Sequence, residues 1–148
     1  ITNEIPEYGF DIVFSLSCID WNVEFDKMLE KIKRYVKPNG WLICSLRFTN
    51  QKSITSFEES YQFINFDGRR EGQKAPYIVL NFSEFINKLR LENGVSEITG
   101  FGFWKSPPHT AITCCSEICY GVLATRYGDK PASSMLNLDF PKDLLETL

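Results

Sequence analysis

The chain has 148 residues, with 16 basic and 19 acidic side chains and a formal net charge of −3. A hydrophobic fraction of 43% and a charged fraction of 24% are typical of one soluble globular domain. The small negative charge excludes a general attraction to nucleic acid, and no apolar run has the length of a membrane span. The composition therefore predicts neither a nucleic-acid nor a membrane partner.

The first part of the chain predicts a strand, a helix and a second strand. Residues 11–16 are apolar and β-prone, and residues 41–47 repeat this pattern. Between them, residues 25–36 carry apolar side chains at steps of three and four, typical of an amphipathic helix that a Lys-Pro-Asn-Gly turn ends. A strand, crossover helix and strand of these lengths form a right-handed βαβ unit, so both strands are expected to be parallel.

Polar residues follow both strands at their carboxyl ends, where ligands bind in open α/β sheets. Asp20 and Asn22 are interpreted first as helix caps and second as ligand contacts. Trp21 has two equal interpretations, a hydrophobic staple onto the helix or a wall of the ligand crevice. Arg47 is interpreted first as solvated or paired and second as a ligand contact.

The middle of the chain predicts two helices on either side of a polar loop. Residues 56–64 begin with a capping-box pattern and indicate a short helix. Residues 65–75 are polar and contain glycine, which predicts a flexible loop. A short apolar run then leads into a helix over residues 82–89, with Asn81 as its cap.

The last part of the chain predicts two further strands and a tail. Residues 97–104 alternate glycine with bulky side chains, and residues 117–125 are continuously apolar and are expected inside the sheet. A loop that contains His109 joins them. We divide the chain into a domain over residues 1–127 and a tail of unknown role over residues 128–148.

The five cysteines show no metal-binding spacing. No C-x-x-C pair occurs and there is one histidine, so no zinc site is expected. The odd number argues against a fully paired set of disulfides. Reduced, mostly buried thiols fit a cytoplasmic protein. The cysteines are Cys18, Cys44, Cys114, Cys115 and Cys119.

The βαβ unit resembles the carboxy-terminal half of a class I S-adenosylmethionine-dependent methyltransferase domain. In that family an acidic residue opens the fourth strand, as Asp11 does here, and a Leu-Lys-Pro-Gly-Gly turn precedes the fifth. This chain has Val-Lys-Pro-Asn-Gly, with Asn39 in place of the first glycine. The departure is mild because asparagine tolerates a left-handed backbone. The resemblance covers about residues 5–127.

This resemblance implies an α/β, Rossmann-like methyltransferase fold. Its sheet is mostly parallel and ends in an antiparallel hairpin, with the final strand inserted between the fifth and the sixth. It also implies a methyltransferase that uses S-adenosyl-L-methionine and acts on a small-molecule substrate.

The same resemblance implies site residues. Arg47 is assigned to the substrate side by its position at the strand end. His109 is interpreted first as a surface histidine without a role and second as a substrate contact, because some members of the family place such contacts in this loop. No catalytic residue is assigned, because a sulfonium methyl group is already activated and the acceptor mainly needs alignment. Trp21 is assigned by its position at the end of the first strand, and the others by the family's crevice. The residues on the cofactor side are Ser15, Leu16, Ser17 and Trp21.

Two family features have no counterpart in this sequence. These are the glycine-rich turn after strand one, since no G-x-G-x-G occurs, and the acidic residue after strand two. We therefore interpret the chain, which begins at Ile1, as the second half of a domain and expect it alone to bind S-adenosylmethionine weakly or not at all. Its first strand is expected to be an apolar edge that another segment covers or that makes an intermolecular contact.

Two other functions stay open at this point. A non-catalytic Rossmann-like interaction module is favoured by the missing glycine-rich turn. Half of a nicotinamide-dependent dehydrogenase would have a sheet of the same kind, but the Lys-Pro-Gly-like turn is no recurrent mark of that family. The sequence upstream of Ile1 and a cofactor-binding test would separate the three functions.

Overall fold

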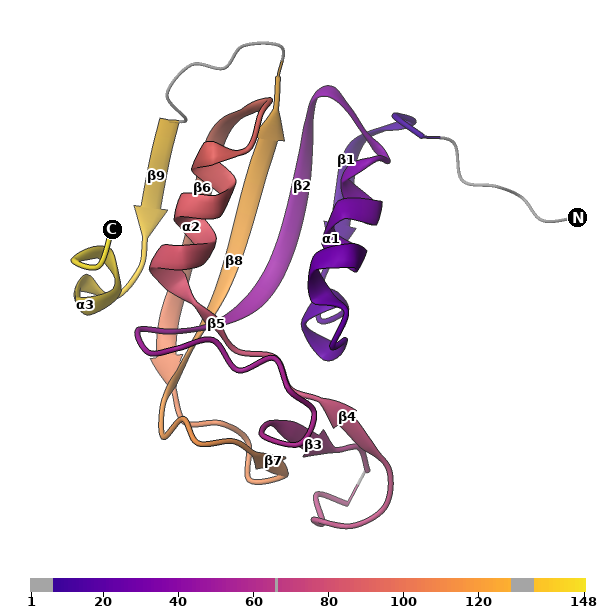
Figure 1. Cartoon of the computed structure of the whole chain (residues 1–148), viewed down its shortest axis with the longest axis vertical. Coiled ribbons are helices and arrows are strands. Elements are labelled where there is room, and N and C mark those ends of the chain that lie inside the picture. Colours follow the sequence, from indigo (N-terminus) through magenta and orange to yellow (C-terminus); the bar gives the residue numbers. More distant parts are fainter. Residues whose placement is uncertain (1–6, 66, 129–134) are drawn as a thin grey trace, which may run out of the picture.

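The computed structural model describes residues 7–65, 67–128 and 135–148. They form a central six-stranded sheet together with the helices α1 (Phe25–Lys33) and α2 (Phe82–Leu91). Figure 1 shows both helices in front of the sheet. Apolar residues of both helices join one core with the strands, so α1 and α2 cover the same face. None of the helices in these ranges is long and apolar enough to cross a membrane.

The strand order confirms the predicted βαβ unit and the predicted hairpin. From edge to edge the order is β1 (Phe10–Ser15), β2 (Val36–Thr49), β8 (Ile118–Tyr127), β6 (Val95–Lys105) and β9 (Met135–Asp139). β5 (Leu80–Asn81) also pairs with β2. β1 and β2 are parallel, with Ile12 beside Trp41. β8 is antiparallel to β2 and β6 and lies between them, as expected for the inserted final strand.

The sheet is mixed over the described residues, which corrects the expectation of a mostly parallel sheet. Its two longest pairings, β2 with β8 and β6 with β8, are antiparallel. The parallel pairings of β1 with β2, β2 with β5 and β6 with β9 are shorter. β6 and β8 can pair along their length because antiparallel neighbours need no crossover helix between them.

Local sequence explains where the helices begin and end. α2 starts after Asn81, whose Oδ1 accepts a hydrogen bond from the Glu84 amide at 2.8 Å, so the predicted cap is confirmed. α1 ends at Lys33, earlier than predicted, because Val36 already begins β2. Asn39, which lies within β2, has a φ of 64°, the left-handed conformation expected at its place in the Lys-Pro-Asn-Gly sequence.

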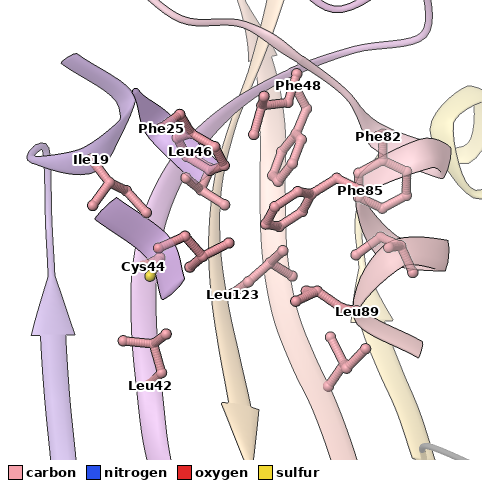
Figure 2. Close-up of a cluster of buried hydrophobic side chains, with 14 of the residues drawn as sticks. Ile19, Phe25, Leu42, Cys44, Leu46, Phe48, Phe82, Phe85, Leu89 and Leu123 are labelled. Carbon is pink, nitrogen blue, oxygen red and sulfur yellow. The ribbon is translucent and has the colours of Figure 1, made fainter. Parts of the chain in front are cut away.

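The main core lies between the sheet and the two helices. Figure 2 shows apolar side chains of β2 and β8 on the side of the sheet where those of α1 and α2 lie. Leu42 and Leu46 of β2 are buried there, and Ser45 and Arg47 alternate with them toward the opposite face. This alternation gives the sheet one face covered by helices and a second face with a different set of side chains.

A small second sheet replaces a predicted helix. Its order is β4 (Lys74–Pro76), β3 (Tyr61–Phe63) and β7 (Ala111–Ile112). The helix predicted over residues 56–64 is therefore wrong; Ser56 begins a turn, and residues 61–63 are extended. Tyr61 and Phe63 favour a strand, and the Lys74 ammonium lies 4.3 Å from the centre of the Tyr61 ring. Pairing with distant segments thus outweighs the local capping-box signal.

The tail adds a strand and a helical turn to the main unit. β9 pairs in parallel with β6, and α3 (Lys142–Leu145) follows it. Leu144 is fully buried, and the Phe140 ring lies 4.8 Å from that of Phe82. The Trp104 indole nitrogen donates to Asp143 Oδ1 at 3.0 Å. The described part of the tail is therefore packed against the domain core.

Two glycines make room for the tail. A Cβ atom built on Gly121 would lie 2.7 Å from Phe140 Cε1, and one built on Gly102 would lie 2.5 Å from the same atom. Real Cβ atoms do not approach other atoms so closely, and Phe140 is itself buried. The glycines of β6 and β8 are therefore part of the docking site for Phe140.

We expect Gly121→Ala to lower the free energy of unfolding by about 1–3 kcal/mol, because the added methyl group overpacks the contact with Phe140. Phe140→Leu combined with Gly121→Ala should recover part of this loss, since the smaller side chain vacates the ring position. Chemical denaturation of both variants and of Phe140→Leu alone measures the coupling. An unchanged stability of Gly121→Ala would contradict this packing.

β1 lies at one end of the sheet. Within the described residues it pairs only with β2. Phe14 is 62% exposed and Ile12 is 49% exposed, so the strand presents apolar side chains as expected. The contact predicted along this edge stays a prediction.

Candidate functional site

A buried ion pair joins the segment after β1 to β2. Asp20 lies in a short 3-10 helix, η1 (Ile19–Trp21), and Arg47 lies on β2; both are almost fully buried. Arg47 Nε donates to Asp20 Oδ2 at 2.8 Å, and Nη2 donates to the Asp20 backbone oxygen at 2.7 Å. These bonds fix the position of η1 against the sheet.

The pair corrects one expectation and supports another. Asp20 does not cap α1, because Glu24 is the N-cap residue. Asn22 comes closer to a capping role, since its Oδ1 accepts from the Glu24 amide at 2.8 Å. Arg47 is paired, which was its first interpretation.

Aromatic rings enclose the guanidinium group. Its central carbon lies 3.7 Å from the centre of the Tyr77 ring and 4.6 Å from that of the Trp21 ring. The two rings meet edge to face at 5.9 Å. Contacts of this kind stabilise a cation, most of all where water is excluded. Trp21 therefore packs on the ion pair.

Burial dominates the electrostatics of the site. Loss of solvent raises the pKa of Asp20, and the Arg47 charge opposes this shift. Burial also raises the pKa of Tyr77, with a further contribution from its hydrogen bond to Tyr120. The two phenol oxygens are 2.5 Å apart. Tyr77 therefore remains a neutral phenol at physiological pH.

A cavity of about 240 Å³ lies beside the ion pair. Its wall on the sheet consists of two neighbouring rows of side chains across β2, β8 and β6, on the face opposite the helices. The strand register places the rows side by side. They are Arg47, Tyr120 and Phe103 in one row and Ser45, Val122 and Phe101 in the next. The remaining wall includes Trp21, Tyr77, Gln62 and Pro108.

The structure brings three of the six predicted site residues to this cavity. Ser17, Trp21 and Arg47 line it. Ser17 has a φ of 52°, and its backbone N–H donates to Ser45 Oγ at 2.7 Å. Ser15 is buried in β1 and Leu16 is half exposed at the strand end, and neither is among the lining residues. The assigned roles of all these residues stay predictions.

His109 lies at the rim of this region. Its side chain is exposed, and the neighbouring Pro108 is the loop residue that lines the cavity. The His109 backbone oxygen accepts from Arg70 Nε at 2.5 Å. Its substrate-binding role also stays a prediction.

Sequence reasoning missed most of the aromatic wall. The sequence indicates only strand or core positions for Tyr77, Tyr120, Phe101 and Phe103. One signal was available, because an arginine inside an apolar strand requires a buried partner and an enclosing surface. The identity of those partners depends on the strand register, which the sequence does not specify.

A larger groove of about 560 Å³ lies between the N-terminal ends of α1 and α2. The Lys88 ammonium pairs there with Asp26 Oδ1 at 2.6 Å. Both side chains are largely solvated, and their two charges pair with each other. No motif of the sequence points to this groove, so the smaller cavity is the better candidate.

The cavity suits a small molecule better than a whole nucleoside cofactor. Its volume of about 240 Å³ lies below the roughly 300–1,000 Å³ of sites that enclose drug-sized ligands. The resemblance assigns the methionine part of S-adenosylmethionine to the turn after β1, and this role stays a prediction. The backbone bends at Ser17, and Leu16 is accessible there.

Comparison with known proteins links this region to one family. Residues 2–44 match the family model described as a methyltransferase domain. No curated protein matches the chain. The matched segment includes β1, η1, α1 and the first part of β2, and thus one wall of the cavity. The match agrees with the resemblance of this segment to a class I S-adenosylmethionine-dependent methyltransferase domain.

Proposed function

We propose that this chain is part of an S-adenosylmethionine-dependent methyltransferase whose small-molecule acceptor occupies the cavity beside Asp20 and Arg47. One observation carries the proposal. The segment that matches the methyltransferase family ends in the strand that supplies Arg47, and its turn after β1 supplies Ser17 and Trp21. The segment that matches the family and the cavity therefore lie at the same edge of the sheet. This is the edge where ligands bind in open α/β sheets.

In this proposal the cofactor lies against the turn formed by Ser15, Leu16 and Ser17. When bound, S-adenosylmethionine supplies a methyl group that is already activated for transfer. The Ser17–Ser45 hydrogen bond holds this turn against β2. The turn and the cavity are adjacent because Ser17 belongs to both.

The task of the chain's own residues is to position the acceptor. Trp21 and Tyr77 form a rigid wall around the guanidinium group, and Phe101 and Phe103 extend the apolar surface. A flat acceptor held between such surfaces loses rotational freedom before reaction, and this accounts for much of the rate gain in transfers of this kind. Exclusion of water by the same rings favours transfer to the acceptor.

Trp21→Ala tests the site. We expect the variant to raise the KM for the acceptor by about tenfold or more, because it removes one ring of the wall and loosens Arg47. Initial rates at saturating S-adenosylmethionine measure the change, and cofactor affinity is determined separately.

Trp41→Ala is the matched control. Trp41 lies on β2 outside the lining residues of the cavity and packs on Arg126. Its replacement should leave the acceptor KM near the wild-type value. If Trp21→Ala leaves the acceptor KM, the cofactor affinity and the turnover all unchanged, Trp21 has no place in the site.

A further inference from the structure

We infer that the cavity selects an uncharged, planar aromatic acceptor that carries a hydroxyl group. This inference rests on the proposed function for its biological role. The argument for the ligand's chemistry is independent of methyl transfer, because it uses only the groups that line or adjoin the cavity.

The charge of the site is already balanced. Arg47 brings one positive charge and Asp20 one negative charge, and their side chains are 4% and 6% exposed. An anionic ligand would lose its hydration without meeting a free cation, and a cationic ligand would likewise find no free carboxylate. Burial of an unpaired charge is strongly unfavourable. The cavity should therefore reject ionised analogues of its ligand.

The polar groups around the cavity still have unused hydrogen-bonding capacity. Arg47 Nη1 and Asp20 Oδ1 are buried without a hydrogen-bond partner. The Tyr77–Tyr120 hydrogen bond uses one phenol proton, so the other proton remains available to a third group. A ligand hydroxyl can both donate and accept a hydrogen bond. It can therefore serve as a partner for these groups without bringing a charge into the cavity.

The shape of the lining favours a flat ring. Phe101 and Phe103 are each 55% exposed although they are large and apolar. Phe103 and Tyr120 lie with their rings 6.4 Å apart and tilted by 31°. Trp21 and Tyr77 face the same cavity. Aromatic surfaces of this kind bind aromatic ligands through stacked or edge contacts.

The test compares 2-naphthol with 2-naphthoate, which have the same ring system but differ in charge at neutral pH. Equilibrium dialysis against the intact protein, without cofactor, gives both dissociation constants. We expect 2-naphthol to bind at least about tenfold more tightly. Equal or tighter binding of 2-naphthoate overturns the inference, as does binding of neither compound at millimolar concentration.

Asp20→Asn should remove or reverse the preference. The variant keeps the size of the side chain but leaves the Arg47 charge uncompensated, so affinity for 2-naphthoate should rise at least about tenfold over wild type. Asp11→Asn is the matched control, because it removes the same charge from an 84% exposed side chain that pairs with Lys37. It should leave the ratio of the two affinities unchanged; an equal rise in both variants overturns the inference.

Phe103→Ala keeps the test decisive if Asp20→Asn fails to fold. Phe103 lies at the cavity surface, so its replacement should weaken 2-naphthol about fivefold or more with little change in stability. Phe57→Ala, which removes a 37% exposed ring outside the lining, is the control. Unchanged 2-naphthol binding by Phe103→Ala overturns the inference. Probe binding as expected in a protein that transfers no methyl group would instead contradict only the proposed function.

Discussion

Replacement of Arg47 by methionine is expected to lower the free energy of unfolding by about 3–5 kcal/mol, because it leaves the buried carboxylate of Asp20 without a counter-charge. Arg47 donates both the Nε and the Nη2 hydrogen bonds that hold η1. Methionine fills a similar volume, so the loss should come mainly from electrostatics. Chemical denaturation followed by circular dichroism measures it.

Removing both charges should cost far less than removing one. In the double variant Asp20→Leu with Arg47→Met, no buried charge remains, and apolar replacements of a buried ion pair are often close to neutral. We expect its stability to approach the wild-type value. A double variant as unstable as Arg47→Met alone would show that packing, not charge, explains the loss.

The deficit of Arg47→Met should also depend on pH. Burial raises the pKa of Asp20, and without Arg47 the opposing charge is absent, so the pKa rises further. A carboxyl group with a raised folded pKa stabilises the fold below its unfolded pKa and loses that contribution as the pH rises through the folded pKa. The deficit should therefore shrink as the pH falls from about 8 to about 5. A deficit that grows on acidification would contradict the account.

Phe48→Ala is expected to lower the free energy of unfolding by about 3–5 kcal/mol through loss of buried area and creation of a cavity. Phe48 is fully buried at the point where β2, α2 and the tail meet, as Figure 2 shows for β2 and α2. Its ring lies 5.3 Å from Phe82, 5.9 Å from Phe85 and 6.0 Å from Phe140. Deleting the ring therefore removes the contacts of β2 with both α2 and the tail at once.

The control for this prediction is Phe57→Ala. Phe57 is 37% exposed and lies outside the main core, so its removal should change stability by less than about 1 kcal/mol. Denaturation midpoints of both variants are compared at equal protein concentration. Similar losses in both would contradict the placement of Phe48 at the centre of the core.

Much of the main sheet could be predicted from local patterns. The apolar runs, the helix period and the Asn81 cap each depend on residues that lie within a few positions of one another. The sequence therefore indicates them directly. The parallel pairing of the first two strands followed from the length of the connection between them. The inserted final strand came from the family resemblance rather than from the residues alone.

The second sheet and the tail strand could not be predicted in this way. Residues 61–63 carry a local helix signal, but they pair with residues 74–76 and 111–112, which lie far away in the sequence. The docking of Phe140 depends on Gly102 and Gly121, whose roles appear only when β6 and β8 are in register. Non-local pairing decides these elements.

The candidate site could be predicted only in part, again because non-local pairing decides which residues meet there. Strand ends indicated the neighbourhood of Trp21 and Arg47, because this edge binds ligands in open α/β sheets. The sequence could not indicate that Tyr120 and Phe103 lie in one row with Arg47, since that requires the register of two strand pairings. The buried partner of Arg47 is Asp20, for which the local sequence favours a helix cap.

The most direct test of the central claim is to map cofactor binding in the intact protein by NMR. S-adenosylhomocysteine is titrated into ¹⁵N-labelled protein, and amide and indole shifts are followed. The account predicts the largest changes at Leu16, Ser17 and the Trp21 indole, with little change at the Trp41 indole. Saturable binding that shifts none of the residues around the turn after β1, or no binding at millimolar concentration, would contradict the proposed methyltransferase site.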